Sequence, residues 1–175
     1  DGINYSRALM PRLPAEVLLD AVHASLDRPG SFKQYKDITR AVALPGIKGT
    51  FLDGNPHHDD RFLRLFGKPP RLINSDAERL NDISLAQVFE MTSGETLSAL
   101  LEMEGNRLNQ LLDDELSNEE ILSTLYWSTI TRTPSTREQE TLLPHLANPS
   151  RETRLKALQD ITWALLNSKE FIFRH

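Results

Sequence analysis

The sequence predicts a mainly all-α fold: a helical bundle preceded by a long irregular N-terminal half with room for one or two short strands. Two observations support this. From residue 84 onward, apolar residues recur at helical spacing between capping signals. Between residues 31 and 83 that spacing is mostly lost, and Pro, Gly and Asn are frequent. We expect one domain over 1–175, with a helix and a loop-rich segment in 1–83 and the bundle in 84–175.

The composition is that of an ordinary folded domain. Hydrophobic residues make up 39% and charged residues 26% of the 175 residues, which is enough to bury a core without metals or disulfides. The formal net charge is −5, and the basic residues are scattered. Because nucleic-acid binding needs clustered Lys and Arg, we expect no nucleic-acid partner.

Cysteine is absent, which excludes disulfides, thiolate catalysis, Cys-zinc sites and covalent haem attachment from this chain. We expect no cofactor in it. No apolar run approaches the roughly 20 residues of a membrane-spanning helix, so no membrane span is expected. The chain begins Asp1-Gly2-Ile3 without an initiator Met, and we expect it to be a fragment of a longer multidomain protein.

The N-terminal half holds two expected helices. The first begins around Pro14, which suits a first helical turn, and is ended by Pro29-Gly30. His23 lies near its apolar face and is interpreted as a packed or partly exposed histidine rather than a ligand. Thr39–Leu44 (TRAVAL) is a candidate lone strand. A short helix is expected from about Asp60, within an irregular stretch of the kind that is often functional or partner-binding.

Capping boxes mark the helices of the C-terminal half. In this motif a Ser side chain and a Glu or Gln three residues later satisfy each other's backbone N–H groups. The sequence contains three such pairs: Ser84 with Gln87, Ser117 with Glu120, and Ser135 with Glu138. Pro144 should kink or end the helix that it lies in. The last three helices are then short-looped neighbours in a bundle.

The most apolar and aromatic stretch is Asp160–His175 (DITWALLNSKEFIFRH), at the end of the last helix. Ser150 caps that helix, and Leu165 continues its apolar stripe. Core packing is the expected role of its aromatic residues and of one Trp upstream, and an exposed patch for a partner or a sugar is the alternative. These residues are Trp127, Trp163, Phe171 and Phe173.

The cluster His57-His58-Asp59-Asp60 is the candidate metal site, since two imidazoles and two carboxylates could hold a divalent cation. Adjacent residues rarely point to one centre, however, and no HxxxH or HxH spacing is present. The alternative is a solvated loop that caps the helix beginning near Asp60. No nucleophile elbow, phosphate-binding loop, dinucleotide fingerprint or HExxH motif appears, so the sequence indicates no reaction.

Several segments, in order along the chain, resemble the DUF1553 (PSD1) domain, of which this chain corresponds to the C-terminal portion. They are Asn4–Ala8, Pro11–Ala21, Arg40–Pro45, Phe62–Arg71, Ser84–Gln87, Arg132–Pro134 and Trp163–Phe171. The family's Pro-Arg-Arg-Leu stands here as Met10-Pro11-Arg12-Leu13, with one arginine fewer. Within these segments Arg12, Arg40 and Arg71 are the candidate partner or ligand surface.

The resemblance implies a planctomycete-type exported protein, and hence a periplasmic or extracellular location. It also implies neighbouring DUF1549 and cytochrome c-like domains as partners, with haem in a separate domain. The leading hypothesis is a non-catalytic helical module that packs against or recruits partners to a neighbouring domain. One alternative is a sugar-binding, metal-binding or hydrolytic domain using the 53–71 loop. Another is an accessory domain to a cytochrome c-type electron-transfer module.

Overall fold

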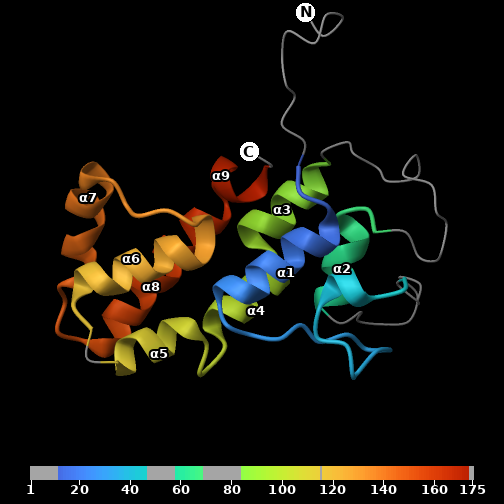
Figure 1. The fold of residues 1–175 in the computed structure, drawn as a ribbon, viewed down its shortest axis with the longest axis horizontal. Coiled ribbons are helices and arrows are strands. Elements are labelled where there is room, and N and C mark those ends of the chain that lie inside the picture. The colour runs from blue at the N-terminus through green and yellow to red at the C-terminus, as the bar shows by residue number, and fades with distance from the viewer. Residues whose placement is uncertain (1–11, 47–57, 69–83, 115, 174–175) are drawn as a thin grey trace, which may run out of the picture.

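The computed structural model describes residues 12–46, 58–68, 84–114 and 116–173, and this part of the chain is all-α (Figure 1). The elements are α1 (Ala15–Ser25), the 3-10 helix η2 (Ala41–Ala43), α2 (His58–Leu65), α3 (Leu85–Ser93), α4 (Glu95–Glu102), α5 (Arg107–Asp113), α6 (Asn118–Ile130), α7 (Thr136–Leu146), α8 (Arg151–Leu166) and α9 (Lys169–Ile172). Within the described ranges no strand forms, and an isolated antiparallel bridge joins Arg12 to Phe173.

The strand expected at Thr39–Leu44 is wrong, because this segment forms the 3-10 helix η2. The reason is a contact made by α1. The Asp20 carboxylate accepts hydrogen bonds from the backbone N–H groups of Ala41 (2.5 Å) and Val42 (3.2 Å). Two consecutive N–H groups that converge on one side chain cannot point to opposite sides, as they do in an extended strand.

Helix α1 lies between two groups of helices (Figure 1). It packs against α6 on one side and against α2 and η2 on the other. Helices α6, α7 and α8 pack against one another, as expected for the bundle, and α8 also contacts α4, α5 and α9. The two ends of the described chain meet, since the Leu13 N–H donates to the Ile172 carbonyl at 3.0 Å.

All three predicted capping boxes are present, with both reciprocal hydrogen bonds in each. Ser150 caps α8 as predicted, by accepting from the Thr153 N–H at 3.4 Å. Helix α1 ends at Ser25, earlier than the predicted end at Pro29-Gly30. Just after the helix, Asp27 adopts a positive φ of 53°. Pro144 lies inside α7, which ends shortly after it at Leu146.

The predicted stripe on the last helix is buried: Leu158, Thr162 and Leu165 belong to the core, and Leu155 packs against it. Phe171 is buried as well. The expected core role of the two tryptophans is wrong, because Trp127 is 54% and Trp163 39% exposed. Helical periodicity placed them on helices correctly, but their sides of α6 and α8 are not covered by a described neighbour.

Candidate interaction surface

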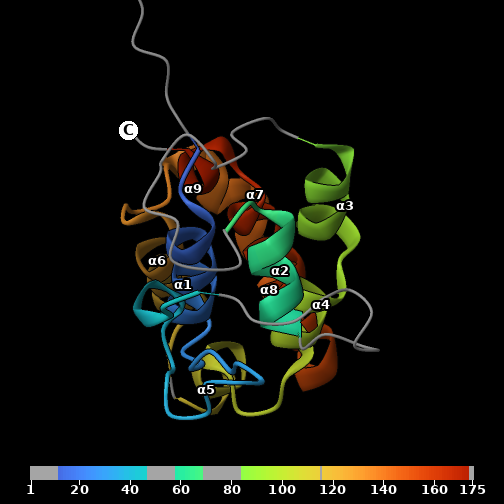
Figure 2. The same ribbon diagram turned by 90° about the vertical axis from the view of Figure 1, so that its right-hand side faces the viewer.

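Helix α3 carries three large apolar residues on the side away from the core. Leu85 (72% exposed), Val88 (47%) and Phe89 (59%) are spaced by three and four residues, so they form one face of the helix. We call these three residues the α3 patch. Figure 2 shows α3 at the periphery of the molecule. An apolar helix face is normally the buried one, so this arrangement marks a surface suited to a partner.

The buried side of α3 consists of Met91, which joins the core, and of two polar residues, Gln87 and Glu90, each of which has a partner. Gln87 donates from its Nε2 to the Leu65 carbonyl at 2.9 Å, and its Oε1 accepts from Arg12 at 2.5 Å. The same oxygen accepts from the Ser84 N–H in the capping box. Gln87 therefore ties the start of α3 to α2 and to the segment before α1, which holds the α3 patch on the outside.

Glu90 makes the second inward connection of α3. Its side chain is 2% exposed and lies 3.5 Å from the Arg61 Nη2 of α2. Its Oε1 accepts from the Thr96 hydroxyl at 2.7 Å and from the Thr96 N–H at 3.4 Å. The Thr96 hydroxyl oxygen also lies 3.1 Å from the His58 carbonyl oxygen, which competes with Glu90 for the single hydroxyl proton. Because a buried carboxylate is costly unless it is paired, these contacts fix the rotation of α3 about its axis.

An apolar groove of about 270 Å³ adjoins the α3 patch. Its lining includes Phe66 from the end of α2, Val88, Met91 and Thr92 from α3, and Phe173 from the C-terminal segment. Val88 belongs to both the groove and the α3 patch, so the two form one surface. The Trp163 indole N–H donates to the Thr92 carbonyl at 3.1 Å, which brings an exposed aromatic ring to the end of α3.

Arg12 is the only charged residue among the described residues that line this groove. Its guanidinium lies over the Phe66 ring, 5.0 Å from the centroid, and donates to the Phe66 carbonyl at 3.2 Å as well as to Gln87. No carboxylate of the described residues forms an ion pair with it. Burial lowers the pKa of Arg12 from its ordinary value.

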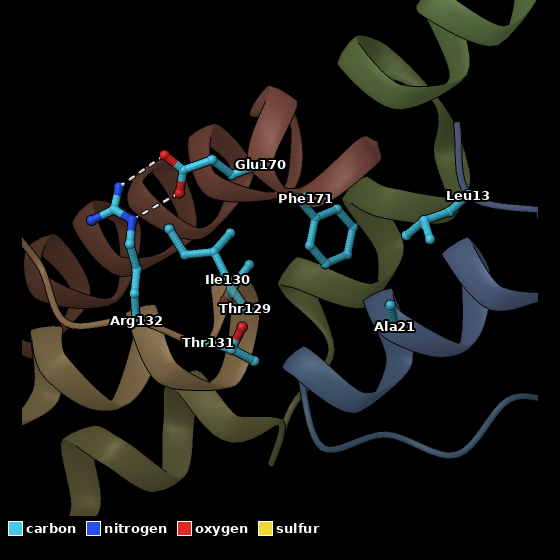
Figure 3. A pocket seen from close by; sticks show the side chains of 8 residues that line it. All are labelled: Leu13, Ala21, Thr129, Ile130, Thr131, Arg132, Glu170 and Phe171. Atoms are coloured by element: carbon cyan, nitrogen blue, oxygen red, sulfur yellow. Dashed lines mark hydrogen bonds and ion pairs between the residues drawn. The ribbon is translucent and has the colours of Figure 1, made fainter. Parts of the chain in front are cut away.

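A larger cleft of about 490 Å³ lies between α1, the end of α6 and α9 (Figure 3). It holds Arg132, but that guanidinium is occupied, with hydrogen bonds to both oxygens of Glu138 (2.8 and 2.9 Å) and to Glu170 (2.8 Å). The Thr129 hydroxyl is buried and forms no hydrogen bond with a described residue. The described residues that line the cleft therefore offer a ligand no charge without a partner. The smaller groove does offer one, the guanidinium of Arg12.

The ion pairs of Arg132 shift the pKa values of their partners. The hydrogen bonds that Arg132 donates lower the pKa of Glu138 well below its usual range, and the same kind of hydrogen bond to Glu138 and to Glu170 raises the pKa of Arg132. Burial, followed by the charge of Glu138, raises the pKa of Tyr126 to about 12. Near neutral pH Arg132 and Glu138 therefore stay charged and Tyr126 stays neutral, which suits a structural role for these three groups rather than proton transfer.

The structure spreads the described part of the predicted metal cluster in three directions. His58 Nδ1 lies 3.7 Å from Glu95, Asp59 pairs with His23 at 3.1 Å, and Asp60 accepts from the Lys33 N–H at 3.1 Å. Consecutive residues of a helix point about 100° apart, which explains the divergence. Within the described residues no group of three or more His, Cys, Asp or Glu could hold a metal, and His57 lies outside them.

His23 is buried, as its interpretation as a packed histidine requires, and its partner is a carboxylate. Of the three candidate arginines, Arg12 lies in the groove, whereas Arg40 is largely exposed and lies 3.8 Å from Asp20. Arg71 is outside the described residues. The sequence did not reveal the α3 patch, because periodicity marks an apolar face without telling whether a neighbour covers it.

No family model, curated protein or solved structure matches this chain. None of the helices in the described ranges is long and apolar enough to cross a membrane. The function must therefore be argued from the geometry of the surface itself.

Proposed function

We propose that this chain is a non-catalytic helical interaction module whose binding surface is the α3 patch with the adjoining groove. One observation carries the proposal: α3 turns Gln87 and Glu90 into the molecule and leaves Leu85, Val88 and Phe89 in solvent. Exposed apolar residues that form a continuous surface next to a groove are typical of protein-binding sites.

The energetic argument is that the exposed face would gain from being covered. Burying a large apolar side chain contributes roughly 1.5–3 kcal/mol relative to leaving it exposed. Phe89 and the nearby Trp163 are of the residue types that contribute most at interfaces. The inward contacts of Gln87 and Glu90 hold this face in place before any partner arrives, which lowers the entropic cost of binding.

The wider context of the module is proposed from the family resemblance alone. We propose that the chain belongs to the DUF1553 (PSD1) type, within an exported multidomain protein of the periplasm or the cell exterior. The partner is then a neighbouring domain of the DUF1549 or cytochrome c-like type. Any haem belongs to that separate domain, which would make this module an accessory to electron transfer.

Site-specific photo-crosslinking in the natural host tests the proposed function. A photoreactive phenylalanine analogue at Phe89, in whichever full-length protein carries this sequence, should give one discrete adduct. It is an internal crosslink to a neighbouring domain of the same protein or a crosslink to a second polypeptide, and mass spectrometry of the digested protein locates it. The matched control is the same analogue at Glu140, an exposed position on α7. Identical adduct patterns at the two positions, or none at Phe89, would count against an interaction surface on α3.

The metal-binding alternative at the 53–71 loop has its own test. Calorimetric titration with calcium and with zinc should give no binding heat, because His58, Asp59 and Asp60 engage Glu95, His23 and Lys33 instead of one centre. Saturable heat that disappears in an Asp60→Asn variant would favour the alternative over the interaction module.

A further inference from the structure

Among the described residues no carboxylate pairs with Arg12 at the groove, whereas several other arginines have such a partner. Arg132 and Arg151 each pair with a carboxylate at the surface, and Arg61 pairs with Glu90 and Glu95. The Arg12 side chain is partly buried, yet its hydrogen bonds go to the neutral oxygens of Gln87 and Phe66. A partly desolvated guanidinium without a counter-charge strongly favours an added anion.

The surroundings of Arg12 also fix its position. Gln87 binds one end of the guanidinium, the Phe66 carbonyl binds the other, and the Phe66 ring lies beneath it. These two hydrogen bonds use two of the five N–H donors that an arginine carries. The remaining donors are available to a carboxylate, which an arginine can bind through two parallel hydrogen bonds.

We propose that the groove binds a polypeptide segment that places an Asp or Glu carboxylate on Arg12 and apolar side chains on the α3 patch. This inference rests on the proposed function and adds the chemistry of the partner. A polypeptide fits better than a small acidic molecule, because the groove continues through Val88 onto the exposed Leu85 and Phe89. The net charge of −5 disfavours general attraction of acidic partners, so Arg12 selects the position of one carboxylate.

Selection from a library of short random peptides displayed on phage tests this inference. The full chain should enrich peptides with one acidic residue among apolar ones, and Arg12→Gln should weaken their binding about tenfold. Arg12→Glu should enrich peptides with a basic residue in place of the acidic one. The matched control is Arg40→Gln, since Arg40 is exposed and lies outside the groove lining. Thermal melts of each variant verify folding.

The outcomes separate the two proposals. Peptides that bind the chain and lose binding in Phe89→Ser, but show no acidic preference and tolerate Arg12→Gln, would overturn the inference and leave the interaction module standing. A selection in which the chain and Phe89→Ser enrich the same peptides would contradict both. Arg12-dependent binding of decanoate, measured by calorimetry and unaffected by Phe89→Ser, would also overturn the inference by identifying a fatty-acid site.

Discussion

At the scale of single residues, arginine–carboxylate and histidine–carboxylate contacts join segments that are distant in the sequence. Arg132, just after α6, binds Glu138 at the start of α7 and Glu170 on α9. His23 of α1 pairs with Asp59 of α2 where both side chains are almost fully buried. The first contact lies at the surface and the second in the interior, so the two should differ in energy.

We expect Glu138→Gln to lower the free energy of unfolding at neutral pH by about 1 kcal/mol, since it removes an ion pair of two parallel hydrogen bonds. The folded-state pKa of Glu138 is depressed below its ordinary value of 4.5. Its contribution is therefore fully present above about pH 4.5 and is lost progressively as the pH falls from there through the folded pKa. At about pH 3.5 the difference in unfolding free energy between the variant and the original chain should be smaller than at neutral pH, but not zero. Urea denaturation at neutral pH and at about pH 3.5 measures this, with Glu140→Gln as the matched control.

Asp59→Ala should destabilise the protein by about 1–3 kcal/mol, because it removes the acceptor of the Ser31 N–H and the buried carboxylate that lies 3.1 Å from His23 Nε2. The neighbouring Asp60 accepts from the Lys33 N–H in a more exposed place. Asp60→Ala should cost less than about 1 kcal/mol. Chemical denaturation of both variants measures the two losses of unfolding free energy. Equal losses would show that the buried contact of Asp59 with His23 contributes no more than the more exposed hydrogen bond of Asp60.

Among the elements, α3 is the one whose orientation depends on close packing at its end. Gly94 follows the helix with φ −74°, a backbone conformation open to any residue. A glycine is needed there for space, since an added Cβ would collide with the carbonyl oxygen and the side chain of Glu90. That contact lets Glu90 turn inward toward Thr96, which keeps the apolar face outside.

Gly94→Ala should therefore lower the free energy of unfolding by roughly 1–3 kcal/mol, through overpacking against Glu90. Ser93→Ala, at the adjacent exposed position, should change it by no more than about 0.5 kcal/mol. Thermal or urea denaturation provides the comparison. A stable Gly94→Ala variant would mean that Glu90 can rotate away, and that α3 is not fixed by this contact.

At the scale of the whole molecule, the core and the exposed apolar surface are separate. Buried residues from each of the helices α1 to α9 form one cluster, to which α3 contributes only Met91, and the α3 patch does not belong to it. Stability and binding should then respond to different substitutions, because only residues removed from water contribute to folding through burial.

The double variant Val88→Ser, Phe89→Ser tests this separation. Its free energy of unfolding should stay within about 1 kcal/mol of the original, since both side chains are already about half exposed. The fluorescence of an apolar dye such as bis-ANS, and the binding of any enriched peptide, should fall. Loss of folding would show that the patch supports the core. A Leu101→Ser variant, which alters the buried core, is the opposite control and should unfold readily.

The sequence by itself determined the class of fold, the helices of the C-terminal half and their beginnings. Capping boxes such as Ser117 with Glu120 could be predicted because both partners lie within one turn, so their hydrogen bonds depend on local geometry alone. The stripe through Leu158 and Leu165 could be predicted because the helical period places those residues on one face.

Only the tertiary structure decided which faces are covered. The apolar spacing of Leu85, Val88 and Phe89 is the same whether α3 turns it inward or outward, and partners distant in sequence, Arg12 and Arg61, fix the outward choice. The 3-10 turn at Ala41 depends on its hydrogen bond to Asp20 in α1. Asp59 turns toward His23 of α1 instead of toward a metal centre. The family resemblance made Arg12 a candidate for a partner surface, but it did not predict that Arg12 lies in a groove. Such contacts arise from the packing of separate elements, which no local pattern encodes.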